Sequence, residues 1–169
     1  AEVDVLTCLP NYPEGRIYED SAIMQDILYP VKRLAETEEV LYFYHTETVG
    51  ITRSAYSIDK TDEVLYAKKR MIFFRQKREP ELYRLARKQY GIVLLKHYYL
   101  LKKSKVANKK MLLRLREEQK KYLKGLGWKK RLPFQVGLVF EAGRYLPYLC
   151  GGLIVWWDTF LEKRYRNQA

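Results

Sequence analysis

The segment "YLPYLCGGLIVWW", residues 145–157, decides which kind of fold this chain adopts. It contains thirteen residues without a charge, although 31% of the residues in the whole chain are charged. A segment of this kind is either part of a buried core or part of a membrane span. The two alternatives lead to different classes of protein, and the flanking sequence is needed to separate them.

The sequence around this segment favours a membrane span. Residues 132–161 contain only three charged side chains, and basic residues flank them on both sides. A helix over residues 133–157 would be about 37 Å long, which is enough to cross a hydrocarbon core of about 30 Å. An apolar centre with aromatic edges and basic flanks is typical of a transmembrane helix. The tryptophans that would lie at the two interfaces are Trp128, Trp156 and Trp157.

Glu141 and Arg144 would lie inside such a span. Isolated charges are costly in a bilayer, but two residues three positions apart share one face of a helix and can form an ion pair. The glycines of the segment would let another helix approach closely. The sequence therefore predicts a span that packs against partner proteins, with an intramembrane ion pair between Glu141 and Arg144.

The alternative is that the same residues form buried elements of a soluble protein. In this case "PFQVGLVFE" and "YLPYLCGGLIVWW" are two elements joined at "EAGR". An uncharged run of thirteen residues is short for a span and common in protein cores. We give the membrane span precedence because of the flanking charges and tryptophans.

Charge divides the chain into regions of different character. Residues 1–66 form an acidic N-terminal segment with a net charge of −8, for which we expect short helices. Residues 67–131 carry a net charge of +19 and are predicted to be helical. Residues 132–161 are the predicted transmembrane helix, and residues 162–169 form a basic tail. The net charge of +12 for the whole chain indicates an anionic partner.

Capping residues predict two helices in the acidic segment and its junction with the basic region. Ser21 is placed to cap a helix that enters at Ala22 and is interrupted at Pro30. A further helical run is expected over residues 31–44, and the aromatic and β-branched residues of the tail, 40–58, leave a short strand or extended stretch as an alternative there. Thr61 is placed to cap a helix that runs to about Lys77.

The basic region is predicted to be helical from residue 80 to residue 124. Pro80 suits the first position of a helix, and apolar residues follow it at helical spacing. Gly125 would end the second part of this stripe as a C-cap. We therefore expect a mostly α-helical, extended protein with amphipathic basic helices and one C-terminal transmembrane helix.

The basic region has three interpretations. It is a solvated surface, an RNA-binding surface in which tyrosines stack on bases, or a platform for anionic lipid or an acidic protein beside the span. We favour the platform because the basic region directly adjoins the apolar one. Its predicted binding residues are Lys120, Lys121, Lys124, Lys129, Lys130 and Arg131.

Catalytic and metal-binding patterns are weak in this sequence. His45 and His97 have no Cys, Asp or Glu at the spacing of metal ligands, so a packed or hydrogen-bonded histidine is the favoured interpretation of each. Phosphate-binding loops and hydrolase motifs are missing from the sequence. We therefore expect no enzyme, no metal site and no cofactor.

Together these patterns predict an accessory or structural subunit of a multi-protein membrane complex. The expected location is the mitochondrial inner membrane, in a respiratory complex or ATP synthase, with the basic region on the matrix side. The expected partners are other subunits and anionic lipid such as cardiolipin. Two alternatives remain, an RNA-binding protein of an organellar ribosome and a soluble helical interaction protein.

Overall fold

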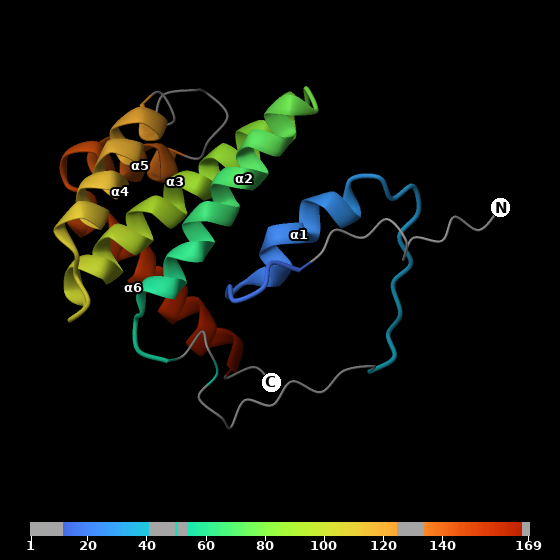
Figure 1. Ribbon diagram of the computed structural model, residues 1–169, viewed down its shortest axis with the longest axis horizontal. Helices are drawn as coiled ribbons and strands as arrows, with labels where there is room; N and C mark the ends of the chain where they lie inside the picture. Colours follow the sequence, from blue (N-terminus) through green and yellow to red (C-terminus); the bar gives the residue numbers. More distant parts are fainter. Residues whose placement is uncertain (1–11, 41–49, 51–53, 125–133, 167–169) are drawn as a thin grey trace.

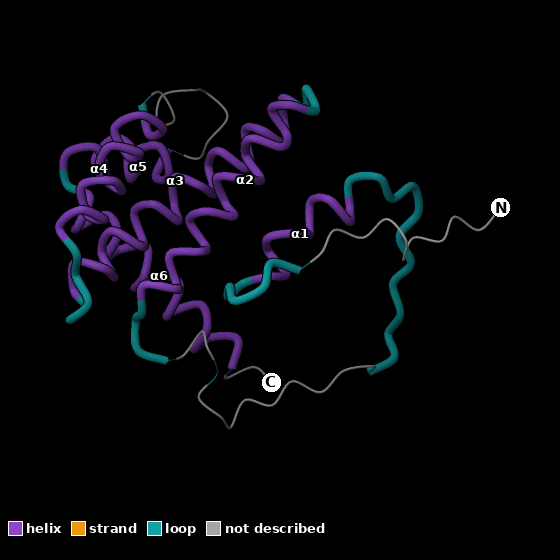
Figure 2. Tube along the Cα trace, in the orientation of Figure 1, coloured by secondary structure: helices purple, strands orange, loops and turns teal. Residues whose placement is uncertain are grey.

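The computed structural model describes residues 12–40, 50, 54–124 and 134–166 of this 169-residue chain. Within these ranges it contains α-helices and a short 3-10 helix, η2 (Ile58–Thr61), and no β-strand (Figures 1 and 2). The prediction of a mostly α-helical protein is therefore confirmed. The helices are α1 (Glu19–Leu28), α2 (Asp62–Gln76), α3 (Pro80–Lys103), α4 (Lys109–Leu123), α5 (Phe134–Tyr145) and α6 (Pro147–Arg166).

Helix α3 is the centre of the fold because it is apolar on more than one side. It packs against α2, α4 and α6, while α5 packs against α4 and α6 (Figure 1). One side of α3 enters a core with α2 and α4, through residues such as Tyr90 and Leu94. Leu95 enters a second core, in which it meets Leu123, Phe140 and Cys150. Each fully buried leucine stabilises the fold by roughly 2 kcal/mol relative to an exposed one.

Polar contacts also join α2, α3 and α4, and two of them meet at Glu118 of α4. The Tyr90 hydroxyl donates a hydrogen bond of 2.7 Å to Glu118 of α4. Lys68 of α2 pairs with the same carboxylate at 2.8 Å. The amide of Gln119, which is fully buried, donates to the carbonyl of Leu94. These bonds satisfy polar groups that the packing of α2, α3 and α4 removes from water.

The N-terminal helix starts earlier than predicted. Helix α1 begins at Glu19, after Tyr18 in the left-handed conformation (φ 59°), so Ser21 lies inside the helix and does not cap it. The helix ends at Leu28, shortly before Pro30, as predicted. Residues 31–40 are exposed and not helical, so the helix predicted for residues 31–44 is wrong over its described part. Helical propensity without a surface to pack on does not hold a helix in water.

The continuous helix predicted for residues 80–124 is also interrupted. Pro80 occupies the first turn of α3 as predicted, but α3 ends at Lys103 and Ser104 is extended. Asn108 then caps α4, because its side-chain oxygen accepts hydrogen bonds from the backbone of Lys110 and Met111. This break folds α4 back onto α3. Thr61 precedes α2 without a capping bond, and Gly125 lies outside the described residues.

The single helix predicted for residues 132–161 is replaced by the pair α5 and α6. Helix α5 ends at Tyr145, and Pro147 begins α6 at a position where its missing N–H costs nothing. Among the described residues, no helix combines the length and the apolar character needed to cross a bilayer. Both helices instead pack on the rest of the chain, α6 on α3 and α5 on α4.

The glycines of α6 allow the close approach that the sequence predicts, although the neighbour is α3 of the same chain. A Cβ atom on Gly151 would overlap the carbonyl oxygen of Leu95 and come within 2.7 Å of Tyr99 Cβ. A Cβ atom on Gly152 would come within 3.2 Å of the Tyr99 ring. The two glycines therefore set the distance between α3 and α6.

Candidate interaction surface and polar pocket

Helix α6 presents a row of large apolar side chains to solvent. The residues recur at helical spacing, so they share the side of α6 that faces away from α3. Trp156 is 62% exposed and Trp157 is 53% exposed, although both are among the largest apolar side chains. We call this set the aromatic face, and it consists of Leu149, Leu153, Trp156, Trp157 and Phe160.

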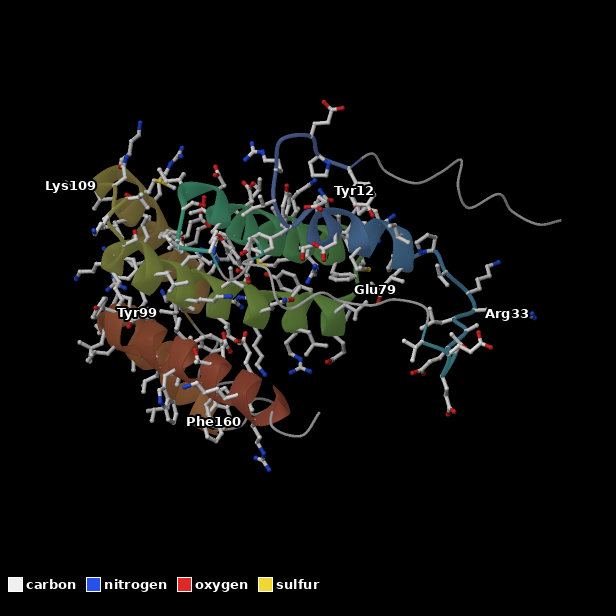
Figure 3. All side chains as sticks on the ribbon, turned by 90° about the horizontal axis from the view of Figure 1, so that it is seen from below. Tyr12, Arg33, Glu79, Tyr99, Lys109 and Phe160 are labelled. Carbon is white, nitrogen blue, oxygen red and sulfur yellow. The ribbon has the colours of Figure 1, made fainter. Side chains whose placement is uncertain are left out.

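The rings of the aromatic face pack against one another and leave their outer sides open. Phe160 stacks on Trp156 with ring centroids 5.9 Å apart, and it lies 5.8 Å from Trp157. Figure 3 shows Phe160 at the lower edge of the molecule, on the outer side of α6. Monomeric proteins rarely expose a contiguous apolar patch of this kind without a binding role.

Cations lie near both ends of α6. At the C-terminal end, Lys163 and Arg164 are exposed and fall on the same side of the helix as Phe160 by helical spacing. At the N-terminal end, the Lys102 ammonium lies 5.0 Å from the ring centroid of Tyr148. The Arg144 guanidinium lies 5.6 Å from the ring centroid of the exposed Tyr145.

An apolar cavity of about 450 Å³ adjoins the aromatic face between α3, α5 and α6. Trp156 and Trp157 form part of its wall, and Lys88 of α3 contributes a cation. The cavity extends the apolar surface from α6 towards the core residues Ile92 and Phe140.

The opposite side of α6 borders a polar pocket of about 410 Å³. At its base, His97 of α3 is almost fully buried and bonded through both ring nitrogens. Nε2 lies 2.9 Å from the Glu63 carboxylate of α2, and Nδ1 lies 2.8 Å from the Tyr56 hydroxyl. Because an ionised carboxylate only accepts, Nε2 carries a proton and donates it to Glu63. Lys96 also pairs with Glu63, at 3.2 Å.

Hydrogen bonds, burial and nearby charges shift the pKa values of Glu63 and Tyr56. Burial by itself would raise the pKa of Glu63, but the hydrogen bond from His97 and the charge of Lys96 outweigh it and lower the pKa to about 2. Burial, followed by the Glu63 charge, raises the pKa of Tyr56. Tyr56 is thus a neutral phenol and Glu63 an anion. The hydrogen bonds among Tyr56, His97 and Glu63 hold together α2, α3 and the segment before η2. His97 is the packed, hydrogen-bonded histidine that the sequence favours, while His45 lies outside the described residues.

The pocket has mixed charge and does not select one type of ion. Lys60 is buried and donates to the carbonyl of Ser54 at 2.7 Å. Asp158 and Glu162 of α6 line the same pocket as Lys60 and Lys96. Partial burial raises the pKa of Asp158, an effect that Lys96 opposes and Glu162 reinforces. Among the described residues, no group of three or more His, Cys, Asp or Glu side chains is arranged to hold a metal ion.

The described members of the predicted binding set lie on one helix and its C-cap. Lys120, Lys121 and Lys124 are exposed on α4 and its C-cap. Figure 3 places α4, marked by Lys109, on the side of α3 opposite to α6. The remaining predicted residues lie outside the described residues, namely Trp128, Lys129, Lys130 and Arg131.

Glu141 and Arg144 do form an ion pair on α5, with 3.0 Å between Arg144 Nη1 and Glu141 Oε2. The two side chains are 17% and 28% exposed, so the pair is partly solvated. Arg116 of α4 donates hydrogen bonds to the carbonyls of Gly143 and Arg144 and so caps the end of α5. The pair therefore stands at the contact between α4 and α5.

Two groups of functional candidates were missed at the level of sequence. Leu149, Leu153 and Phe160 follow the same helical spacing as the tryptophans, and a helix beginning at Pro147 would have placed them on one face. Tyr56, Glu63 and His97 are separated by up to 41 residues, and no sequence pattern links them.

No family model, curated protein or solved structure matches this chain.

Proposed function

We propose that this chain is a non-enzymatic structural subunit that joins a larger assembly through the aromatic face of α6. The observation that carries the proposal is the exposure of Trp156, Trp157 and Phe160 as one ring cluster. Large aromatic side chains of this kind supply much of the binding energy when a partner buries them. The cations at both ends of α6 add attraction for an anionic partner.

The assembly that we propose is a membrane complex of the mitochondrial inner membrane, such as a respiratory complex or ATP synthase. The support for this location is the combination of a basic, tyrosine-rich chain with exposed tryptophans, which occur preferentially at membrane–water interfaces. Fractionation of mitochondria with antibodies against the chain tests the location. Recovery of the chain in another compartment would contradict it.

Incorporation of a tagged chain into high-mass complexes on native gels tests the proposed function. The triple variant Trp156→Ala/Trp157→Ala/Phe160→Ala should move the chain to low mass, because the anchoring rings are gone. Leu85→Ala is the matched control, since Leu85 is also a half-exposed apolar residue but lies on α3. Equal incorporation of the triple variant and the control would contradict docking through this surface.

RNA binding is a second candidate, and it is favoured by the basic surface of α4. This helix and its C-cap expose Lys109, Lys110, Arg114, Lys120, Lys121 and Lys124. Six cations along one helix suit the phosphates of an RNA backbone. Fluorescence anisotropy with a labelled RNA stem-loop tests this candidate. Binding that weakens steeply with salt, and that is lost in Lys120→Glu/Lys121→Glu, would support it, whereas binding independent of these lysines would exclude it.

A further inference from the structure

We infer that the aromatic face of α6 docks on the surface of an anionic lipid bilayer, with α6 lying parallel to the membrane plane. This inference rests on the proposed function and names the partner of the same surface. Four observations support it, and they concern side-chain type, the distribution of charge along α6, the aromatic residues at the N-terminal end, and the packing of α6 on the fold.

The side-chain types of the aromatic face match the membrane interface. Trp156, Trp157 and Phe160 form one exposed ring cluster, and Leu149 and Leu153 continue it by helical spacing. A helix of this composition buries its apolar face at the boundary between headgroups and acyl chains. Tryptophan is favoured there because its ring is apolar while its N–H stays within reach of water and headgroups.

Charge is arranged so that the cations at the end of α6 fall on the same helical face as the aromatic rings, and its acids fall on another face. Lys163 and Arg164 follow Phe160 on the exposed side of the helix. Asp158 and Glu162 lie on the opposite side by helical spacing and line the polar pocket together with Lys96, while Asp158 also borders the apolar cavity beside Trp156 and Trp157. A bilayer that contains anionic lipid would therefore meet lysine and arginine beside the aromatic rings.

The N-terminal end of α6 repeats this combination of cation and aromatic ring. Tyr148 is partly exposed beneath the Lys102 ammonium, and Tyr145 is largely exposed beside the Arg144 guanidinium. Tyrosines in this position suit the headgroup layer, and the two cations can reach lipid phosphates.

The packing of α6 on α3 fixes the orientation of the aromatic face. Gly151 lies against the backbone of Leu95, and the Tyr99 ring lies 4.9 Å from the Tyr148 ring. The helix is therefore held as part of the folded protein, with its aromatic face outward (Figure 3). The surface is formed before binding, and docking does not require it to fold.

Vesicle flotation with the full-length chain tests the inference. The vesicles consist of phosphatidylcholine alone or of phosphatidylcholine and phosphatidylglycerol in a two-to-one mixture. We expect the chain to float with the mixed vesicles and to bind phosphatidylcholine vesicles at least about tenfold more weakly, because each basic residue at the surface adds to the attraction. Raising the salt concentration should weaken binding to the mixed vesicles.

Two variants with the same change in net charge separate local docking from general attraction. Lys163→Glu/Arg164→Glu changes cations beside the aromatic face and should weaken binding roughly tenfold or more. Lys109→Glu/Lys110→Glu makes an equal change on α4, on the far side of α3, and should have a much smaller effect (Figure 3). Equal losses in the two variants would overturn the inference, because they would indicate adsorption by net charge alone.

Quenching by brominated phosphatidylglycerol gives a second measurement that does not rely on disruptive variants. In the wild-type chain, contact with lipid should quench tryptophan emission. Trp128→Phe leaves Trp156 and Trp157 as the tryptophans of the chain, so the emission of this variant should still be quenched by the brominated lipid. Absence of quenching in this variant would overturn the inference, and so would a wild-type chain that does not float with the mixed vesicles.

Failure of this inference is distinguishable from failure of the proposed function. Suppose that the wild-type chain does not bind vesicles, and that the triple variant loses the high-mass complex. The aromatic face then docks on a protein. This result would overturn the lipid partner and leave the structural role standing. A chain whose high-mass complex is unaffected by the triple variant would contradict the proposed function, whatever its behaviour with vesicles.

Discussion

At the scale of single residues, Glu63 stabilises the fold most when its carboxylate is ionised. His97 and Lys96 hold its pKa at about 2 in the folded chain, against an ordinary value of 4.5. A group with a depressed pKa stabilises the fold above its unfolded value and loses this contribution as the pH falls through the folded value. The stabilisation by Glu63 should therefore be complete above about pH 5 and disappear between pH 4.5 and 2.

Replacing Glu63 by Gln should remove this acid dependence. We expect Glu63→Gln to lower the free energy of unfolding by roughly 2–3 kcal/mol near pH 7 and by much less near pH 2.5. Urea unfolding at a series of pH values measures the difference. Asp59→Asn is a suitable control, since Asp59 is an exposed acid of the neighbouring 3-10 helix η2. A constant difference between wild type and Glu63→Gln across this pH range would contradict the assignment.

The ion pair between Glu141 and Arg144 should be worth little. Its side chains retain 17% and 28% exposure, and a partly solvated pair three residues apart contributes about 1 kcal/mol or less. A pair inside a bilayer or a dry core would cost about 3–5 kcal/mol when one partner is removed. Thermal unfolding of Glu141→Ala should thus show only a small loss of stability. A loss of several kcal/mol would instead indicate that the pair is desolvated in the native assembly.

At the scale of elements, the sequence predicts both ends of α2 and the start of α3 nearly correctly because their signals are local. Pro80 and the apolar spacing after it suffice to place the start and the buried side of α3. The breaks after Lys103 and after Tyr145 were missed, since an apolar stripe can continue across a short loop. In each case a local residue marks the restart, Asn108 as the cap of α4 and Pro147 at the start of α6.

The contact between α3 and α6 should depend on Gly151 more than on its neighbour. A methyl group on Gly151 would overlap the Leu95 backbone, which moves only if the two helices separate. A methyl group on Gly152 would meet the edge of the Tyr99 ring, which can rotate away. We expect Gly151→Ala to destabilise the chain by about 1–3 kcal/mol and Gly152→Ala to cost clearly less. Chemical denaturation of both variants measures this order, and the reverse order would contradict the packing described here.

At the scale of the whole molecule, the sequence indicates what the surface contains but not how it is divided. The charge of residues 67–131 and the tryptophans of residues 145–157 are both evident in the sequence. The sequence does not show that α3 separates the basic helix α4 from α6. This separation arises because α4 and α6 pack on different sides of α3. The Tyr56–His97–Glu63 group was unpredictable for the same reason, as its members meet only once α2 and α3 are packed.

Helices α5 and α6 should be part of the folded core and not a removable anchor. Leu95 of α3 and Leu123 of α4 are fully buried in one cluster with Phe140 of α5 and Cys150 of α6. A chain that ends at residue 133 would expose these leucines and the side of α3 that α6 covers. The loss would be several kcal/mol, which is comparable with the total stability of about 5–15 kcal/mol for a domain of this size.

The shortened chain should therefore bind the dye ANS and lose its cooperative thermal transition. The full chain should unfold cooperatively and bind little ANS. A separate membrane anchor gives the opposite expectation, since its removal leaves the remaining domain intact. Circular dichroism melting and ANS fluorescence distinguish the two cases. Leu123→Ala in the full chain provides a milder test of the same cluster, with an expected cost of about 2–5 kcal/mol. A sharp transition in the shortened chain, together with a negligible effect of Leu123→Ala, would place α5 and α6 outside the core.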